Sequence, residues 1–410
     1  LLLFSLNGWS QTTERTYQRE LPVSEQITVS SNVPTSLDLE LQAYNAHTSN
    51  TKFGYIVIGK NNVERFFIHK EYVIHTWDKA LVRQEVDVEV TSDSEANNEA
   101  FLDLLNIELE ESKARQVRID ANMNLAKFTL KNSFFRKDHC EIALAEGQTF
   151  TVTHLAIKTR LYIPKTAHLK VHSIRNHTLL LEDLEGDLDL DIQYGEVFGK
   201  KIGNLNANLF FCYNVIFKEA QRVKASATNS HLKVDSVQHV ALGQEKLRKA
   251  VASKAQLDSW MDNNSSMNIY NFRKVEKMVV WDTANDDFRL GEIDHLEIKS
   301  SVFSDYQILK INQLLELTAR NGDVAISELA KDFQNIQLHN THSKVSINIP
   351  DEGAYTIQIN DVEAVDFKLP TNAQLFEQTS SKNALFKIGN GVHTGQISID
   401  CDKCELDIWK

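Results

Sequence analysis

From about residue 165 the chain alternates short apolar and polar segments, with turn residues between them. Within each segment every second side chain is apolar, which is typical of a strand with one buried face. A frame of two apolar or small residues, separated by two positions, recurs through this region. It occurs at Leu181/Leu184, Gly199/Ile202, Phe217/Ala220, Val234/Val237, Ile269/Phe272, Leu290/Ile293, Ile308/Ile311 and Ile326/Leu329, with Ile347 next.

Successive frames lie 17 to 21 residues apart, except for one step of 35 from Val234 to Ile269. That step is close to two repeats, so we expect one degenerate repeat within it. A second apolar series falls between the frames, which indicates two short strands in each repeat. It comprises Val171, Leu190, Leu209, Ala225, Val280, Ile298, Leu317 and Leu338. The spacing leaves no room for crossover helices, so we predict an all-β fold, a parallel β-solenoid (β-helix) of about ten coils. An antiparallel β-sandwich is the alternative.

Before residue 150 the pattern differs and predicts an N-terminal β-rich cap that carries one helix. Strands are expected at 37–41, 55–58, 72–77 and 86–90. The helix is expected near 94–113, where Phe101, Leu104, Leu105 and Leu109 fall at helical spacing and Ser92 to Ser94 can cap its start. The weakest repeat, at 244–260, fits a short inserted helix as well as a strand.

The pattern divides the chain into four parts. They are a signal-peptide remnant at 1–10, a cap region at 11–150, the solenoid repeats at 151–349 and a strand-rich closing segment at 350–410. The first part is apolar and ends with small residues, Gly8 and Ser10, three and one positions before a cleavage point ahead of Gln11. We therefore expect an exported protein, located in the periplasm, on the outer cell surface or in the medium.

The composition supports one regular body and argues against both nucleic-acid binding and a membrane-spanning segment. The 410 residues include only 15 Gly and 5 Pro, too few for a chain of domains on Gly- or Pro-rich linkers. The net charge of -12 argues against nucleic acid, which requires clustered Lys and Arg. After the first ten residues, no apolar run reaches the roughly 18 residues of a membrane-spanning segment.

Two of the four cysteines, Cys401 and Cys404, form a single CxxC motif. A zinc site requires a second pair or histidine partners, and a thioredoxin-like motif precedes a helix. The flanking sequences here, GQISID and ELDIWK, are strand-like. We predict a disulfide between Cys401 and Cys404 across a turn, as an oxidising compartment allows.

Three segments resemble a known group of proteins. They are Val73–Lys79 followed by the VDVEV strand, Leu161–Lys165 followed by AHLKVHS, and Leu184–Gly195. All three are similar to the exported putative-adhesin family of uncharacterised β-strand-repeat envelope proteins, common in Bacteroidetes-type bacteria. The resemblance covers roughly residues 30–350 and implies a β-helix-like fold in a cell envelope. It implies no catalytic residues, and this chain departs from the group in its scarcity of glycine and in its insertion near 48–65.

The clearest candidate for chemistry is the acidic strand Asp187, Asp189 and Asp191, which alternates with Leu188, Leu190 and Ile192. The alternation places the three carboxylates on one face, where they either bind calcium or form a solvated surface. No catalytic, cofactor or metal motif stands out elsewhere, and the histidines at 168, 172, 177, 339 and 342 suit solvated faces and turns. We expect no cofactor and no catalytic residues.

The sequence therefore predicts a non-enzymatic, adhesin-like structural or ligand-binding module of the cell envelope, whose partner is an envelope protein or a glycan. The alternative is a carbohydrate-active β-helix enzyme that acts on a polysaccharide. A binding surface of the first kind requires an exposed aromatic or polar ladder in register along one face of the repeats.

Overall fold

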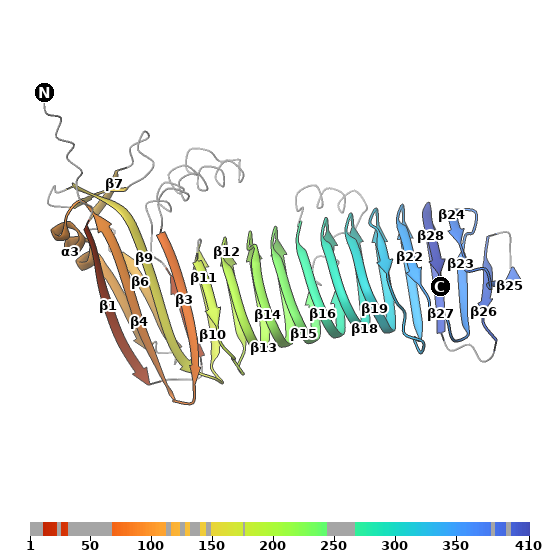
Figure 1. Cartoon of the computed structure of the whole chain (residues 1–410), viewed down its shortest axis with the longest axis horizontal. Coiled ribbons are helices and arrows are strands. Elements are labelled where there is room, and N and C mark those ends of the chain that lie inside the picture. The colour runs from red at the N-terminus through yellow and green to blue at the C-terminus, as the bar shows by residue number, and fades with distance from the viewer. Residues whose placement is uncertain are drawn as a thin grey trace, which may run out of the picture. The chain divides into compact units, whose positions relative to one another are not determined.

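The computed structural model of the chain describes residues 11–22, 26–31, 68–111, 116–123, 128–131, 140–144, 149–174, 177–243, 267–378, 382–390 and 395–410. These residues form an all-β structure with a single helix and a large, mostly parallel open sheet (Figure 1). The chain divides into two compact units. One comprises Leu1–Gly186 and Ile192–Val197, and the other comprises Asp187–Asp191 and Phe198–Lys410.

Several expected features lie outside the described residues. They are the signal-peptide remnant at 1–10, the strands at 37–41 and 55–58, and the alternative helix at 244–260. All of them stay predictions.

The first unit contains parallel and antiparallel ladders. Its strands are β1 (Gln11–Pro22), β2 (Gln26–Ser31), β3 (Ile68–Trp77), β4 (Leu81–Ser92), β5 (Leu105–Glu111), β6 (Gln116–Met123), β7 (Phe128–Lys131), β8 (Cys140–Leu144), β9 (Thr149–Pro164), β10 (His168–Ile174) and β11 (His177–Leu181). β4 pairs antiparallel with β1 and β9, whereas β3 pairs in parallel with β9 and β11. The strands expected at 72–77 and 86–90 are therefore confirmed, within β3 and β4.

The helix, α3 (Glu95–Leu104), is shorter than the sequence predicted. Its start is as expected, because the Ser94 hydroxyl accepts a hydrogen bond from the Asn97 N–H at 3.2 Å. The prediction that the helix continues to residue 113 was wrong. From Leu105 the chain alternates apolar and charged residues, and β5 pairs antiparallel with β6 instead. Pairing with a neighbouring strand outweighs the helical spacing of the leucines.

The second unit consists almost entirely of repeated strands. β12 (Leu188–Gln193) and β13 (Glu196–Phe210) begin at the boundary between the units. They are followed by β14 (Asn214–Thr228), β15 (His231–Leu242), β16 (Ile269–Val280), β17 (Thr283–Ala284), β18 (Asp287–Val302), β19 (Asp305–Arg320), β20 (Val324–Ile326), β21 (Asn335–Thr341), β22 (Lys344–Asn348), β23 (Tyr355–Asn360), β24 (Val365–Lys368), β25 (Gln374–Gln378), β26 (Ala384–Ile388), β27 (Gly395–Asp402) and β28 (Cys404–Trp409). The strands expected after Pro350 are therefore present.

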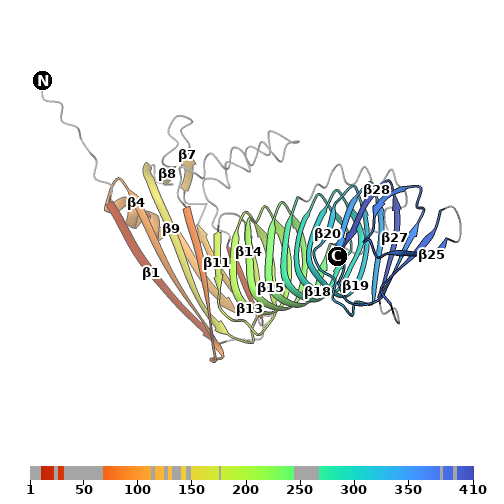
Figure 2. The ribbon, with the colours of Figure 1, turned by 45° about the vertical axis from the view of Figure 1, so that its right-hand side comes forward.

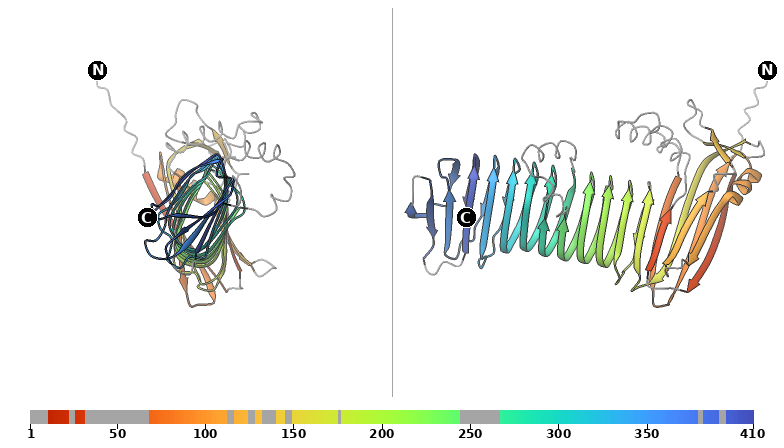
Figure 3. Two further views of the ribbon diagram at one scale, coloured as in Figure 1. Left: turned by 90° about the vertical axis from the view of Figure 1, so that its right-hand side faces the viewer. Right: turned by 180° about the vertical axis from the view of Figure 1, so that it is seen from behind.

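Successive repeats of this unit pair in parallel and in register, as the neighbouring strands in Figures 2 and 3 illustrate. Equivalent residues thus form rows that run across the strands. One buried row consists of Val223, Val240, Met278, Leu296, Leu315, Ile336 and Ile397, none more than 3% exposed. The core of the unit is built from such rows, because each apolar position meets the equivalent position of the next repeat.

The register corrects one sequence frame. Val234 and Val237 face Phe272 and Val275, so the frame at Ile269/Phe272 was placed three residues too early. The expected degenerate repeat was also wrong, because β15 pairs directly with β16.

The corners of the second unit adopt a left-handed backbone with few glycines. Positive φ angles occur at Phe211, Asn229, Met267, Asn285, Phe303, Asn321, His342 and Lys403. Asparagine tolerates this region better than most residues, and at Phe211, Phe303 and His342 the corner N–H donates to a backbone carbonyl of a neighbouring repeat at 2.9 Å. The scarcity of glycine therefore does not prevent tight corners.

A buried polar ladder follows these corners. The N–H of Cys212 donates to Ser230 Oγ at 3.0 Å, and the N–H of Ser230 donates to Asn268 Oδ1 at 3.0 Å. The ladder continues from Asn268 N–H to Asp286 Oδ1 at 2.8 Å, and from Asp286 N–H to Ser304 Oγ at 3.1 Å. Four successive repeats thus use a short polar side chain to satisfy a buried backbone donor of the preceding repeat.

We predict that Asp286→Ala lowers the free energy of unfolding by about 2–4 kcal/mol. The change leaves the N–H of Asn268 and the hydroxyl of Thr283 without their buried acceptor. Denaturant unfolding of the full chain measures the effect. In the control Asp294→Ala, which removes the partly buried acceptor of Asn312, the loss should stay below about 1 kcal/mol. Equal losses would contradict the role of the buried ladder.

Candidate functional site

The parallel register also aligns the exposed side chains of the second unit into rows. Residues equivalent in successive repeats lie about 4.8 Å apart, which is the spacing of neighbouring strands. A functional surface on this unit therefore combines residues that are far apart in the sequence. Two hollows on the surface, described below, are lined by such rows.

The acidic strand forms a regular set of polar rungs. Asn204 Nδ2 donates to Asp187 Oδ1 at 2.7 Å, and Asn206 Nδ2 donates to Asp189 Oδ1 at 2.8 Å. A third rung joins Asn208 Nδ2 to Asp191 Oδ1 at 3.1 Å. Leu188, Leu190 and Ile192 between the carboxylates are at most 2% exposed. The predicted alternation of this strand is thus confirmed, and its carboxylates accept hydrogen bonds from amides of the next repeat.

The calcium alternative for Asp187, Asp189 and Asp191 depends on which residues face these carboxylates. The facing row contributes amides, whose NH₂ groups already occupy one oxygen of each carboxylate. In the part of the chain that the structure describes, no three His, Cys, Asp or Glu side chains cluster closely enough to hold a metal ion.

A basic row continues beside the polar rungs. Arg222 is paired in register with His239, His239 with Lys277, and Lys277 with His295. Lys224 lies two positions after Arg222 on β14, so its side chain emerges on the same face. Together with Asp187 and Asn204, these residues line a groove of about 480 Å³ in the second unit, which we call the basic groove.

The charge of the basic groove contrasts with that of the whole chain. Three of its side chains are basic, namely Arg222, Lys224 and Lys277, whereas the net charge of the protein is -12. Among the described residues, no carboxylate forms an ion pair with Arg222, Lys224 or Lys277. Asp187 is the acidic side chain of the groove, and it accepts a hydrogen bond from Asn204. The groove therefore presents three available cations to an incoming anion.

A nearby row shows that such a concentration of charge does not follow from the fold. Lys274, three residues before Lys277 on β16, faces Ser236 on one side and Glu292 on the other. Glu292 in turn faces Lys310. Acidic and basic residues alternate in this row, which is the usual arrangement on a solvated sheet surface because opposite charges attract across strands.

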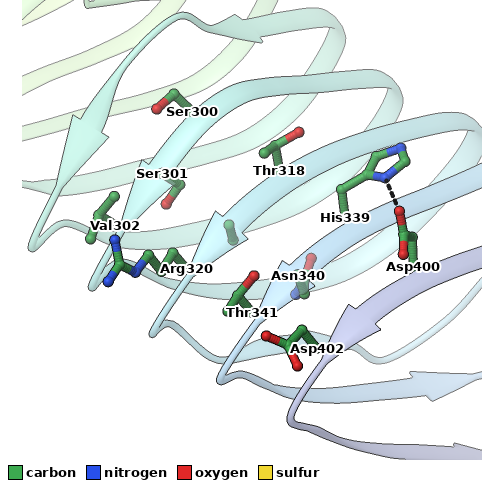
Figure 4. A pocket seen from close by; sticks show the side chains of 11 residues that line it. Ser300, Ser301, Val302, Thr318, Arg320, His339, Asn340, Thr341, Asp400 and Asp402 are labelled. Carbon is green, nitrogen blue, oxygen red and sulfur yellow. Dashed lines mark ion pairs between the residues drawn. The ribbon is translucent and has the colours of Figure 1, made fainter. Parts of the chain in front are cut away.

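A second groove, of about 350 Å³, lies across β18, β19, β21 and β27 (Figure 4). Its ionisable residues are Arg320, His339, Asp400 and Asp402, and His339 Nδ1 lies 3.5 Å from Asp400 Oδ2. Thr318 lies beside His339 in the same row. In the described residues no hydrogen bond joins Thr318 to His339, so the row lacks the contact between nucleophile and base that a catalytic triad requires.

Cys401 and Cys404 flank the corner between β27 and β28. Both side chains are buried, and both are free thiols in the structure. The Cys401 thiol donates a hydrogen bond to the Cys404 sulfur, and this contact raises the pKa of Cys401 and lowers the pKa of Cys404. Burial raises the pKa of Cys401 further. The predicted disulfide is not tested by this geometry and stays a prediction.

The sequence placed the carboxylates of the acidic strand on one face, but it missed their amide partners and the basic groove. Arg222, His239 and Lys277 are separated by 17 and 38 positions, and only the register brings them together. These residues can be found from the repeat pattern of the sequence once Val240 and Met278 are aligned as equivalent buried positions.

Comparisons with known proteins give structural neighbours only. No family model matches the chain, and no curated protein matches it. A putative cell adhesion protein from Clostridium sporogenes is 8% identical, with 97% of this chain and 99% of that chain covered and a TM-score of 0.18. Putative adhesins from Parabacteroides merdae and Parabacteroides distasonis are 9% and 11% identical, with 81% of this chain and 95% and 97% of theirs covered, and TM-scores of 0.28 and 0.29.

These neighbours are putative adhesins, the class that the sequence motifs resemble. Likeness at these TM-scores carries no argument about function, which is therefore argued from the residues of this chain. None of the described helices has the length and apolar character needed to cross a membrane.

We predict that replacing Asn204, Asn206 and Asn208 together by Asp makes the folded state depend on calcium. The substitutions place carboxylates opposite Asp187, Asp189 and Asp191, and the repulsion is relieved by a bound divalent cation. Thermal unfolding with calcium and with a chelator should differ for this variant and coincide for the wild-type chain. A wild-type chain that loses stability in chelator would instead indicate that the carboxylates already bind calcium.

Proposed function

We propose that the chain is a non-enzymatic ligand-binding module of the cell envelope, built as a parallel β-solenoid. The continuous parallel pairing from β14 to β19, which is interrupted only by two register shifts between β18 and β19, supports this architecture. In this proposal residues 151–349 form the coils, about ten in all with their neighbours, while 11–150 form the cap and 350–410 the closing segment. A single coil of about 18 residues cannot fold alone, because ordering its backbone costs roughly 18–36 kcal/mol.

The ligand we propose is an anionic polymer, such as an acidic polysaccharide, bound along the basic groove. The observation that carries this proposal is the row of Arg222, His239 and Lys277, with Lys224 beside it. Among the described residues no carboxylate forms an ion pair with Arg222, Lys224 or Lys277. Arg222 and Lys277 are two strand spacings apart, about 10 Å. A chain with negative groups that repeat at that distance can meet both cations at once.

The basic row lacks the acidic partners that the adjacent row has, which supports the proposal. Glu292 lies between Lys274 and Lys310 in the adjacent row, whereas His239 lies between Arg222 and Lys277. An anionic ligand would supply the opposite charge that the basic row does not find on its neighbouring strands.

We predict that the double variant Arg222→Glu/Lys277→Glu binds acidic polysaccharides at least roughly tenfold more weakly than wild type, a change of about 1.4 kcal/mol. Each substitution replaces an attraction with a repulsion. Binding is measured against polygalacturonate, alginate and heparin, with neutral dextran as the uncharged comparison.

The matched control is Lys274→Glu, which changes the charge of the same strand outside the basic groove. It should leave binding within roughly twofold of wild type, because exposed charge pairs contribute about 0.2–1 kcal/mol each. Loss of binding in the control equal to that in the double variant would show that only overall charge matters. Binding of no acidic polymer in the panel would count against the proposed ligand.

The setting we propose is an exported one: the periplasm, the outer cell surface or the medium. The apolar segment at 1–10, read as a signal-peptide remnant, and the sequence resemblance to envelope proteins support it. In this setting we also propose a disulfide between Cys401 and Cys404. Both are buried at one corner and already share a hydrogen bond, so little movement is needed.

Protein isolated from an oxidising compartment should have a mass lower by two hydrogen atoms, and digestion should recover residues 401 and 404 within one bridged peptide. The loop enclosed by this disulfide is very short, so we expect Cys404→Ser to change stability mainly through lost packing. Free thiols at both positions after non-reducing isolation, found by alkylation of the unfolded chain, would contradict the bridge.

A further inference from the structure

The second groove, of about 350 Å³, opens on the same face of the second unit as the basic groove. The row of Arg222 continues across the neighbouring strands to Asn335 on β21. His339 lies four positions after Asn335, and residues an even number of positions apart along a strand emerge on the same face. His339 is exposed, whereas Ile336 and Leu338 are buried, so the alternation is unbroken between the two positions.

The two grooves are close enough for one extended chain to occupy both. The basic groove ends on β16 at Lys277, and the second groove begins on β18, the next strand. The far side of the second groove is β27, four strand spacings from β16, or about 19 Å. A polymer that is bound along the basic groove therefore reaches the second groove without leaving this face.

The last repeat of the chain supplies the acidic side of the second groove. β27 pairs in parallel with β21 on one side and with β23 on the other, although both strands precede it in the sequence. This pairing places Asp400 opposite His339 and Asp402 opposite Thr341, as Figure 4 illustrates. Both carboxylates are exposed, so the same face is basic at one groove and acidic at the far side of the other.

The remaining polar side chains of the second groove can form hydrogen bonds of both kinds. Thr318 lies exposed beside His339, and Arg320 lies opposite Thr341. The hollow thus combines hydroxyls and a guanidinium with the two carboxylates (Figure 4). Sugar hydroxyls both donate and accept hydrogen bonds, so an uncharged sugar ring suits such a surface.

We infer that the second groove binds uncharged sugar units of the same polysaccharide whose acidic units occupy the basic groove. The inference rests on the function proposed for the basic groove. A chain with a carboxylate on every ring would bring negative groups against Asp400 and Asp402, and like charges across an interface disfavour a partner. An uncharged ring instead donates hydroxyl hydrogen bonds to these carboxylates. The module therefore selects a polysaccharide of mixed charge over a uniformly acidic one.

The test compares oligosaccharides of equal length from two polymers. Hyaluronan carries a carboxylate on every second ring, whereas polygalacturonate carries one on every ring. The wild-type chain should bind hyaluronan more tightly. The variant Asp400→Asn/Asp402→Asn should reduce this preference several-fold, because it removes the repulsion that acts against polygalacturonate. Titration calorimetry with the full chain measures both affinities. A wild-type preference for polygalacturonate, or a preference that the variant leaves unchanged, would overturn the inference.

The charge-matched control is Glu405→Gln/Asp407→Asn on β28, beyond the corner at Lys403. It removes the same amount of negative charge from the same repeat, but outside the second groove. The ratio of the two affinities should stay within roughly twofold of wild type, because exposed charges outside the site contribute little. A fall in the ratio equal to that of Asp400→Asn/Asp402→Asn would mean that only overall charge matters, and the inference would be wrong.

A second variant removes hydrogen-bonding groups without changing the charge. Thr318→Val/Thr341→Val keeps the branched shape of both side chains on their strands. It should weaken hyaluronan binding several-fold and leave polygalacturonate binding within roughly twofold, because only the uncharged rings use these hydroxyls. Equal losses for the two polymers, or no loss for hyaluronan, would contradict the inference.

The variant Arg222→Glu/Lys277→Glu separates this inference from the function on which it rests. If it leaves the binding of both polymers unchanged, or if the wild-type chain binds neither, the proposed function fails and the inference fails with it. If it weakens both while Asp400→Asn/Asp402→Asn leaves their ratio unchanged, the inference alone is wrong.

Discussion

The parallel register at the corners of the second unit is the constraint on which its other features depend. At four successive corners the residue after the left-handed one donates its buried backbone N–H to a short polar side chain of the next repeat, and the acceptors are Ser230, Asn268, Asp286 and Ser304. A slip of one residue would place these side chains against apolar neighbours and turn every buried row outward. The ladder therefore fixes the register, and the register determines which side chains are neighbours on the surface.

This constraint determines which surfaces the fold can present. When the register is fixed, outward-facing residues at equivalent positions of successive repeats become neighbours. The residue types at those positions then decide whether a row gathers charge of one sign or alternates in sign. The row of Lys274, Glu292 and Lys310 alternates, whereas the row of Arg222, His239 and Lys277 does not. The cations of the second row have no carboxylate partner among the described residues, and a bound anion would supply the missing opposite charge.

Much of the fold follows from the period of the sequence, because burial of alternate side chains is a local property. The strands of the second unit and the outward face of Asp187, Asp189 and Asp191 were predictable for this reason. The frame failed at Ile269, because the insertion after β15 changes the spacing without changing the pairing. The helix prediction failed beyond Leu104, because leucines at 105 and 109 fit a strand as well as a helix.

The basic groove and the order of the last repeats could not be predicted in this way. A period gives the positions of strands along the chain but says nothing about which strands become neighbours. The groove depends on pairing across the insertion between β15 and β16, so Arg222 and Lys277 share no local pattern. Its residues were recognisable only after the register had been established.

The order of the last repeats follows from the need to cover the outer edge of β23. The left-handed residue Asp361 comes 19 positions after His342, so the period alone places β23 directly after β21. The hairpin of β25 and β26 decides otherwise, because it pairs with the outer edge of β23 and closes the stack there. Any strand that follows the hairpin in the sequence and runs parallel to β23 has only the inner edge left. The end of the chain is inserted, and not appended, because the terminal edge of a stack is the one edge that must be covered.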